Sequence, residues 1–88
     1  MRHLCWDLGE TGAGADFEVD WDGSTARVCL MDSEEYQAYL DDEAYEYHGG
    51  FYDYSPIVLQ VPYDDYWYLI MDSYDRVKNA TVEQLFDD

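Results

Sequence analysis

The chain has 88 residues and a formal net charge of −17, from 21 acidic residues against four basic ones. This length predicts one domain, residues 1–88, and so few Lys and Arg residues argue against direct binding to nucleic acid or anionic membranes. A content of 48% hydrophobic and 18% aromatic residues excludes a disordered acidic tail, which would lack the side chains needed for a core.

The first part of the chain predicts two strands. Residues 1–8 place Leu4, Trp6 and Leu8 on one face and are followed by a glycine-rich turn over 9–14. Residues 15–22 alternate strictly between apolar and acidic side chains, which indicates a strand with one face on the core and the other in solvent. Asp22-Gly23 is a hairpin turn signal. We therefore expect residues 15–22 and 25–31 to pair as a β-hairpin.

The middle of the chain is acidic. Asp32 and Ser33 predict the cap of a short helical turn, and an acidic break over 41–43 follows it. Residues 44–48 predict a short strand, and Gly49-Gly50 a turn or bulge.

The last part predicts further strands. Residues 57–61 form one that Pro62 ends, and 63–66 predict a hairpin turn into a strand over 67–72. That strand is apolar on both faces and is expected to be central. Residues 77–86 suit a final strand, although 82–86 suit a helical turn equally. The pattern predicts an all-β fold, a small antiparallel β-sandwich or barrel of six to seven strands with one short helical turn.

Several short segments resemble, in order and spacing, the small bacterial family catalogued as domain of unknown function 1883. They are Val28-Cys29-Leu30-Met31-Asp32, Tyr47-His48-Gly49-Gly50, Ser55-Pro56, Val61-Pro62, and Trp67 followed by Asp72. The resemblance covers nearly the whole chain and implies a compact all-β domain, but no activity. Family members carry basic or neutral residues around the Gly-Gly pair, whereas this chain carries acids there. The surface is therefore expected to be acidified over a shared core.

No pattern predicts catalysis, a metal or a cofactor. An EF-hand loop starting at Glu18 fails, because its twelfth position is Cys29 and not Glu. The two His and two Cys residues lack zinc-ligand spacing, and no G-x-S-x-G motif occurs. We expect a protein that is not an enzyme and that needs no cofactor.

The N-terminus lacks the apolar run of a secretion signal, and no stretch approaches the ~20 apolar residues of a membrane helix. We expect a cytoplasmic protein, in the host cytoplasm if it is phage-encoded, with Cys5 and Cys29 as free thiols.

Residues 36–54 contain six Tyr and five carboxylates but no Lys or Arg. Tyrosine joins a large apolar body to a polar tip and is enriched at protein interfaces. This composition predicts a DNA-mimic inhibitor whose carboxylates replace phosphates in the groove of a basic DNA- or RNA-binding protein. The expected partner is a host defence complex, with a CRISPR effector complex first (an anti-CRISPR protein) and a restriction enzyme next.

Two alternatives remain open. A halophile-adapted acidic β domain would carry carboxylates over its whole surface, because molar salt screens their repulsion. A carbohydrate-binding domain would use exposed Trp and Tyr.

The candidate partner-binding residues are the acids of the middle of the chain and four tyrosines that serve as anchors. They are Asp32, Glu34, Glu35, Tyr36, Tyr39, Asp41, Asp42, Glu43, Glu46, Tyr52, Asp53, Tyr54, Asp64 and Asp65. We expect Tyr45, Tyr66 and Tyr68 to belong to the core.

Overall fold

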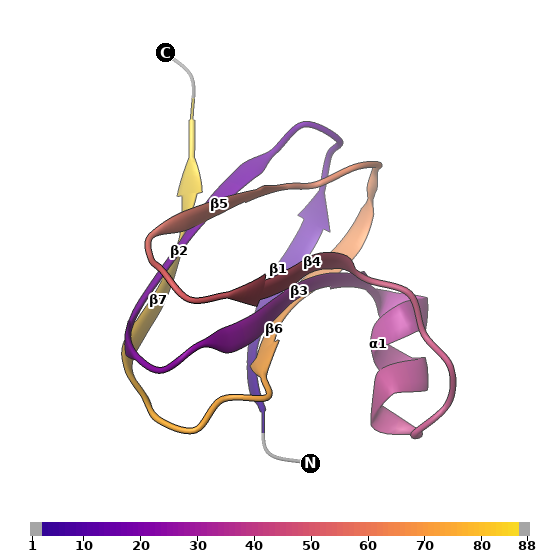
Figure 1. The fold of residues 1–88 in the computed structure, drawn as a ribbon. Helices are drawn as coiled ribbons and strands as arrows, with labels where there is room; N and C mark the ends of the chain where they lie inside the picture. The colour runs from indigo at the N-terminus through magenta and orange to yellow at the C-terminus, as the bar shows by residue number, and fades with distance from the viewer. Residues whose placement is uncertain (1–2, 87–88) are drawn as a thin grey trace.

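The computed structural model of the protein describes residues 3–86. Seven strands and one helix follow one another along the chain (Figure 1). They are β1 (Leu4–Thr11), β2 (Asp16–Gly23), β3 (Ala26–Asp32), α1 (Ser33–Leu40), β4 (His48–Tyr52), β5 (Ile57–Gln60), β6 (Asp65–Asp72) and β7 (Val77–Leu85). Residues 1 and 2 of the predicted first strand lie outside the described residues.

The strands form two antiparallel sheets that pack as a sandwich, which confirms the predicted fold class. One sheet has the order β1-β6-β3-β4 and carries α1 on its outer face; we call it the helix-side sheet. The other has the order β5-β2-β7 and no helix over it; we call it the open sheet. β6 lies between β1 and β3, so the prediction of a central strand is confirmed.

The main core lies between the two sheets. From β2 it receives Phe17, Val19 and Trp21, all buried, while Asp20 and Asp22 on the same strand are exposed. The alternating pattern of this strand is therefore confirmed. From the helix-side sheet the core receives buried side chains of β3 and β6: Ala26, Val28, Leu30, Trp67, Leu69 and Met71.

The predicted hairpin of β2 with β3 is wrong. β2 pairs with β5 and β7, whereas β3 pairs with β4 and β6. The chain crosses from one sheet to the other at Gly23, whose φ of 128° and close approach to the Arg76 carbonyl leave no room for a Cβ. β2 and β3 therefore lie in different sheets and face each other across the core. Their apolar side chains pack against one another there. The hairpin turn predicted over 63–66 is also wrong, because residues 61–64 connect the two sheets and β6 begins at Asp65.

The turn or bulge predicted at the Gly49-Gly50 pair is not observed, although Gly49 has the positive φ for which a glycine was expected there. Both residues lie inside β4, and residues 44–47 before them form no strand. A Cβ on Gly49 would stand 2.0 Å from the carbonyl oxygen of Val28, and its φ is 143°. Gly49 therefore serves the close approach of β4 to β3.

The first and last strands, β1 and β7, lie close to their predicted positions. β1 continues through Gly9 to Thr11, into the first half of the predicted turn, with a register shift between Asp7 and Gly9. Of the two possibilities for the last segment, the strand is the one observed, as β7.

Candidate acidic interaction surface

Helix α1 begins at the end of β3, where Asp32 is its N-cap. The Asp32 Oδ1 atom accepts a hydrogen bond of 2.9 Å from the backbone N–H of Glu35, and Asp32 also accepts one from the Tyr63 hydroxyl. Glu34 and Glu35 lie in the first turn, where carboxylates interact favourably with the helix dipole. The predicted cap is confirmed, and it supports a helix of only eight residues.

Six tyrosines attach α1 and the following loop to the outer face of the helix-side sheet. Tyr36 of the helix packs against Tyr68 of β6 with ring centroids 4.4 Å apart and the ring planes tilted by 31°, and Tyr39 contacts Tyr45 of the loop edge-on at 5.1 Å. Further ring contacts connect these pairs into one series, the tyrosine array: Tyr66, Tyr68, Tyr36, Tyr39, Tyr45 and Tyr47. All members of the array except Tyr66 pack on a second small core made of Cys29, Met31 and Ile70.

A buried ion pair lies under the array. Asp72 is fully buried and accepts two hydrogen bonds from the Arg27 guanidinium, of 2.7 and 2.6 Å, and one of 2.6 Å from the Tyr39 hydroxyl. Arg27 also donates to the Tyr45 hydroxyl at 2.7 Å, and its guanidinium carbon lies 5.0 Å from the centre of the Tyr47 ring. Burial alone would raise the pKa of Asp72, but the bonds from Arg27 and Tyr39 outweigh it and lower that pKa. The charges of this pair therefore hold α1 in place and are not available to a partner.

Seven of the predicted acids lie together on α1 and the loop after it, and we call them the helix–loop acidic surface. The set is Asp32, Glu34, Glu35, Asp41, Asp42, Glu43 and Glu46. Five are exposed, and Asp32 and Glu35 are half-buried. A groove of about 600 Å³ between the helix and the loop is bordered by Glu34, Glu35 and Glu43. The loop is tied to the helix, because the Glu46 N–H donates to the Glu35 carboxylate at 2.5 Å.

The other three predicted acids lie apart from this surface, Asp53 and Asp64 on connections and Asp65 at the start of β6. Asp53 is exposed between β4 and β5. Asp64 accepts a hydrogen bond of 2.7 Å from the backbone of Ala13, and Asp65 accepts one of 2.6 Å from the N–H of Tyr66. Asp64 therefore links the connection before β6 to the turn between β1 and β2, and Asp65 belongs to β6.

The four tyrosines predicted as anchors divide into two groups. Tyr36 and Tyr39 belong to the tyrosine array, and half-buried Tyr52 packs against the main core, so these three hold the fold together. Tyr54 is 64% exposed and stays available for contact. The tyrosines expected in the core, Tyr45, Tyr66 and Tyr68, are half-buried members of the array.

Sequence reasoning did not find the Arg27–Asp72 pair or the exposed aromatic residues Phe51 and Tyr63. One signal for the pair was present: Arg27 is the only basic residue inside the predicted strand over 25–31, where a charge without a partner would be costly.

A second acidic surface lies on the outer face of the open sheet. Asp16, Glu18, Asp20 and Asp22 follow one another along β2, at the centre of that sheet, and we call them the open-sheet acidic row. Its neighbours in register include the exposed apolar residues Val58 and Leu85.

The two cysteines are both free, with Cys5 exposed and Cys29 buried. Burial raises the pKa of Cys29 to about 12, although the charge of Arg27 partly opposes this shift. Trp21 and Trp67 are buried and Trp6 is half-buried, so the exposed Trp on which a carbohydrate-binding site would depend is not found in residues 3–86.

Among residues 3–86, no group of three or more His, Cys, Asp or Glu side chains is arranged to hold a metal ion. In the same part of the chain, no helix has the length and apolar character needed to cross a membrane.

Comparison with known families gives one match. The model of the family described as Domain of unknown function (DUF1883) matches residues 1–85, so the chain belongs to this family. The resemblance inferred from the short segments is thereby confirmed. Searches of curated proteins and of solved structures found no match.

Proposed function

We propose that the protein is a non-catalytic inhibitor that binds the nucleic-acid groove of another protein by DNA mimicry. The helix–loop acidic surface would take the place of the phosphates, and the target would be a host defence complex. A CRISPR effector complex is the first target class to test and a restriction enzyme the second. The observation that carries the proposal is the concentration of seven carboxylates on one helix and its loop, on a rigid support.

The charge around this surface supports the proposal. No Lys or Arg lies between Arg27 and Arg76 in the sequence, and Arg27 is occupied by Asp72. Among residues 3–86 the other basic residues are Arg76 and Lys78, which lie at or next to β7, in the other sheet. The carboxylates of the helix–loop acidic surface therefore have no basic neighbours along their own segment, and a partner's Lys and Arg side chains can approach them.

The rigidity of the support also favours binding. The tyrosine array and the buried pair fix α1 on the sheet, and the Glu35–Glu46 hydrogen bond fixes the loop on α1. A surface that is ordered before binding loses little conformational entropy when it meets its partner. Tyrosines thus contribute through the stability of the surface, with Tyr54 as the predicted anchor that is left exposed.

The physical driving force would be the one that proteins use for DNA. A basic groove arranged for one charge per ~1.7 Å of duplex axis releases anions when it binds a dense set of carboxylates. Affinity should therefore fall steeply with salt concentration.

A competition experiment tests the proposal. Purified CRISPR effector complexes and restriction enzymes are incubated with fluorescently labelled target DNA and increasing amounts of the protein, at two salt concentrations. Displacement of DNA that weakens at higher salt is the expected result. If every complex in the panel binds its DNA equally well with a large excess of the protein present, the proposal is wrong.

The open-sheet acidic row favours a second candidate, salt adaptation, because it lies on the sheet opposite the helix. Acids on both outer faces are what a high-salt cytoplasm would select, since the Debye length is roughly 3 Å at 1 M salt. This candidate predicts that folding needs molar salt. A cooperative thermal melt in low-salt buffer would argue against it.

A further inference from the structure

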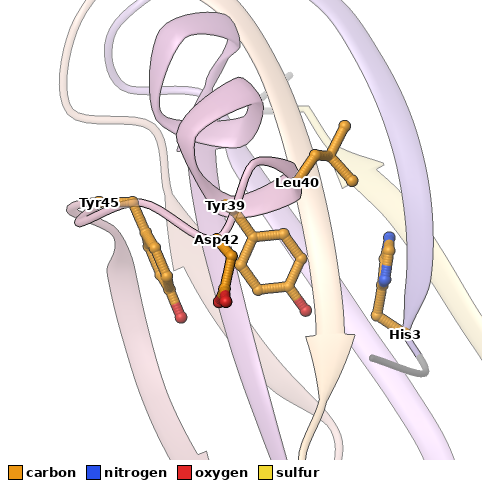
Figure 2. A pocket seen from close by; sticks show the side chains of 5 residues that line it. All are labelled: His3, Tyr39, Leu40, Asp42 and Tyr45. Carbon is orange, nitrogen blue, oxygen red and sulfur yellow. The ribbon is translucent and has the colours of Figure 1, made fainter.

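A pocket of about 530 Å³ lies where α1 ends, apart from the groove bordered by Glu34, Glu35 and Glu43. It is lined by His3, Tyr39, Leu40, Asp42 and Tyr45 (Figure 2). Its volume is within the range of sites that hold small molecules. The lining combines three aromatic rings, one aliphatic side chain and one carboxylate.

The Tyr39 ring stands at right angles to each of the other two rings. The planes of Tyr39 and Tyr45 meet at 87° with centroids 5.1 Å apart, and those of His3 and Tyr39 meet at 87° with centroids 5.3 Å apart. Hydrogen bonds at the base fix two of them, since the Tyr39 hydroxyl donates to Asp72 and the Tyr45 hydroxyl accepts from Arg27. The Asp42 side chain lines the same pocket as these rings (Figure 2). Two of the three aromatic walls are thus held in place by hydrogen bonds, and Tyr39 is perpendicular to both of the other rings.

The electrostatics of the pocket favour a cation. Asp42 brings a full negative charge, and it occupies the left-handed region (φ 59°) in the turn that ends the helix. The last turn of α1 contains no basic residue, so the negative end of the helix dipole is not compensated there by its own side chains. The nearby positive charge of Arg27 is neutralised by Asp72.

We infer that this pocket binds an organic cation, an alkylammonium group. Aromatic faces attract such cations through their quadrupoles, and clusters of aromatic rings recognise alkylated ammonium groups; here a carboxylate belongs to the same lining. A bare metal ion would instead require several oxygen or nitrogen ligands, whereas Asp42 is the one carboxylate in this lining. The inference is independent of the proposed function, because Asp42 can bind a small cation whether or not the helix–loop acidic surface binds a protein groove.

The alkylammonium group can belong to a free small ion or to a lysine side chain of another protein. Two probes separate these sources: tetramethylammonium chloride and N-acetyl-lysine methylamide, each titrated at pH 8 with total ionic strength held constant by sodium chloride. Binding is followed through the NMR signals of Leu40, Tyr39 and Tyr45. We expect saturable shifts with at least one probe, and the tighter of the two identifies the source.

Two substitutions and one matched control make the experiment decisive. Asp42→Asn should weaken binding about tenfold or more, because it removes the charge inside the pocket. Asp53→Asn removes the same charge from an exposed loop and should change the affinity by less than about twofold. Tyr45→Phe keeps the ring and should retain binding. The inference is wrong if neither probe gives a saturable response beyond that of sodium chloride, or if Asp42→Asn and Asp53→Asn weaken binding equally.

Discussion

The strands of the two sheets place acidic side chains in different environments on the two outer faces of the sandwich. On the helix-side sheet, Asp72 is fully buried and paired with Arg27, under a layer of tyrosines that attaches α1. On the open sheet, the carboxylates of β2 stand at the surface with no helix over them. A carboxylate is thus fully buried where a guanidinium and a hydroxyl satisfy its oxygens, whereas the carboxylates of β2 are half-buried or exposed. The acidic composition of this chain therefore has two separate uses, one in stability and one in surface charge.

The largest expected effect that separates the two faces is the loss of the buried carboxylate. Asp72→Asn should lower the free energy of unfolding by about 3–5 kcal/mol, because it leaves the Arg27 charge buried without its partner. Asp20→Asn in the open-sheet acidic row should change it by less than about 0.5 kcal/mol. Urea unfolding of both variants measures this difference. Equal losses would contradict the distinction between the faces.

Removing one hydroxyl from the tyrosine array should have the next largest effect. Tyr39→Phe deletes the hydrogen bond to the buried Asp72 carboxylate and should cost about 1.5–3 kcal/mol. Tyr54→Phe removes the same atom from an exposed ring and serves as the control. If both variants melt at the temperature of the unmodified protein, the Tyr39 bond does not stabilise the helix.

Protonation of the Asp72 carboxylate should contribute to the loss of stability at acidic pH. Its pKa in the folded state is lowered from the ordinary value of 3.8, so the stabilisation is complete above that value and is lost as pH falls through the folded-state pKa. The stability difference between the unmodified protein and Asp72→Asn should therefore shrink as the pH falls below about 4. Urea unfolding of both proteins across this pH range checks the trend, and a difference that grew in acid would have the wrong sign.

The smallest effect concerns reactivity and leaves stability unchanged. Cys29 lies beneath the tyrosine array with a pKa of about 12, whereas Cys5 is exposed. A thiol reagent at pH 8 should modify Cys5 faster than Cys29 by roughly 100-fold or more, and urea should remove the difference. Similar rates in the native protein would show that the array does not protect the second core.

The positions of the strands could be predicted from sequence better than their partners. Strict alternation identified β2, and apolar residues on both faces identified β6 as central, because both signals are local. Pairing depended on segments far along the chain: β2 lies between β5 and β7, which the Asp22-Gly23 turn signal could not reveal. The glycine at position 49 is required because the carbonyl of Val28 on the neighbouring strand lies close to it. The sequence does not show this contact, so Gly49 was interpreted as part of a turn.

For the candidate site, the sequence predicted which acidic residues lie together, but it did not predict which tyrosines are exposed. The acids of the helix–loop acidic surface are consecutive or nearly so in sequence, so the fold brings them together with little rearrangement. Tyr36 and Tyr39 are equally close in sequence, yet the direction in which α1 faces the sheet decides that they are packed and not presented to a partner. Amino-acid composition alone does not distinguish a tyrosine that binds a partner from a tyrosine that packs in the core.

The central claim is that the helix–loop acidic surface, and not net charge alone, binds the basic groove of a nucleic-acid-binding protein. Two variants with equal loss of charge separate these possibilities. One neutralises Glu34, Asp41, Glu43 and Glu46 and leaves the Asp42 pocket intact; the other neutralises Asp16, Glu18, Asp20 and Asp22. Each Asp is replaced by Asn and each Glu by Gln, which have nearly the same size as the acids and no charge.

The most direct measurement is the concentration of each variant that displaces labelled DNA from a purified CRISPR effector complex. We expect the concentration needed for displacement to rise at least about tenfold for the helix–loop variant, and to stay within about threefold of that of the unmodified protein for the open-sheet variant. Equal losses in the two variants, or no displacement by the unmodified protein, would contradict it.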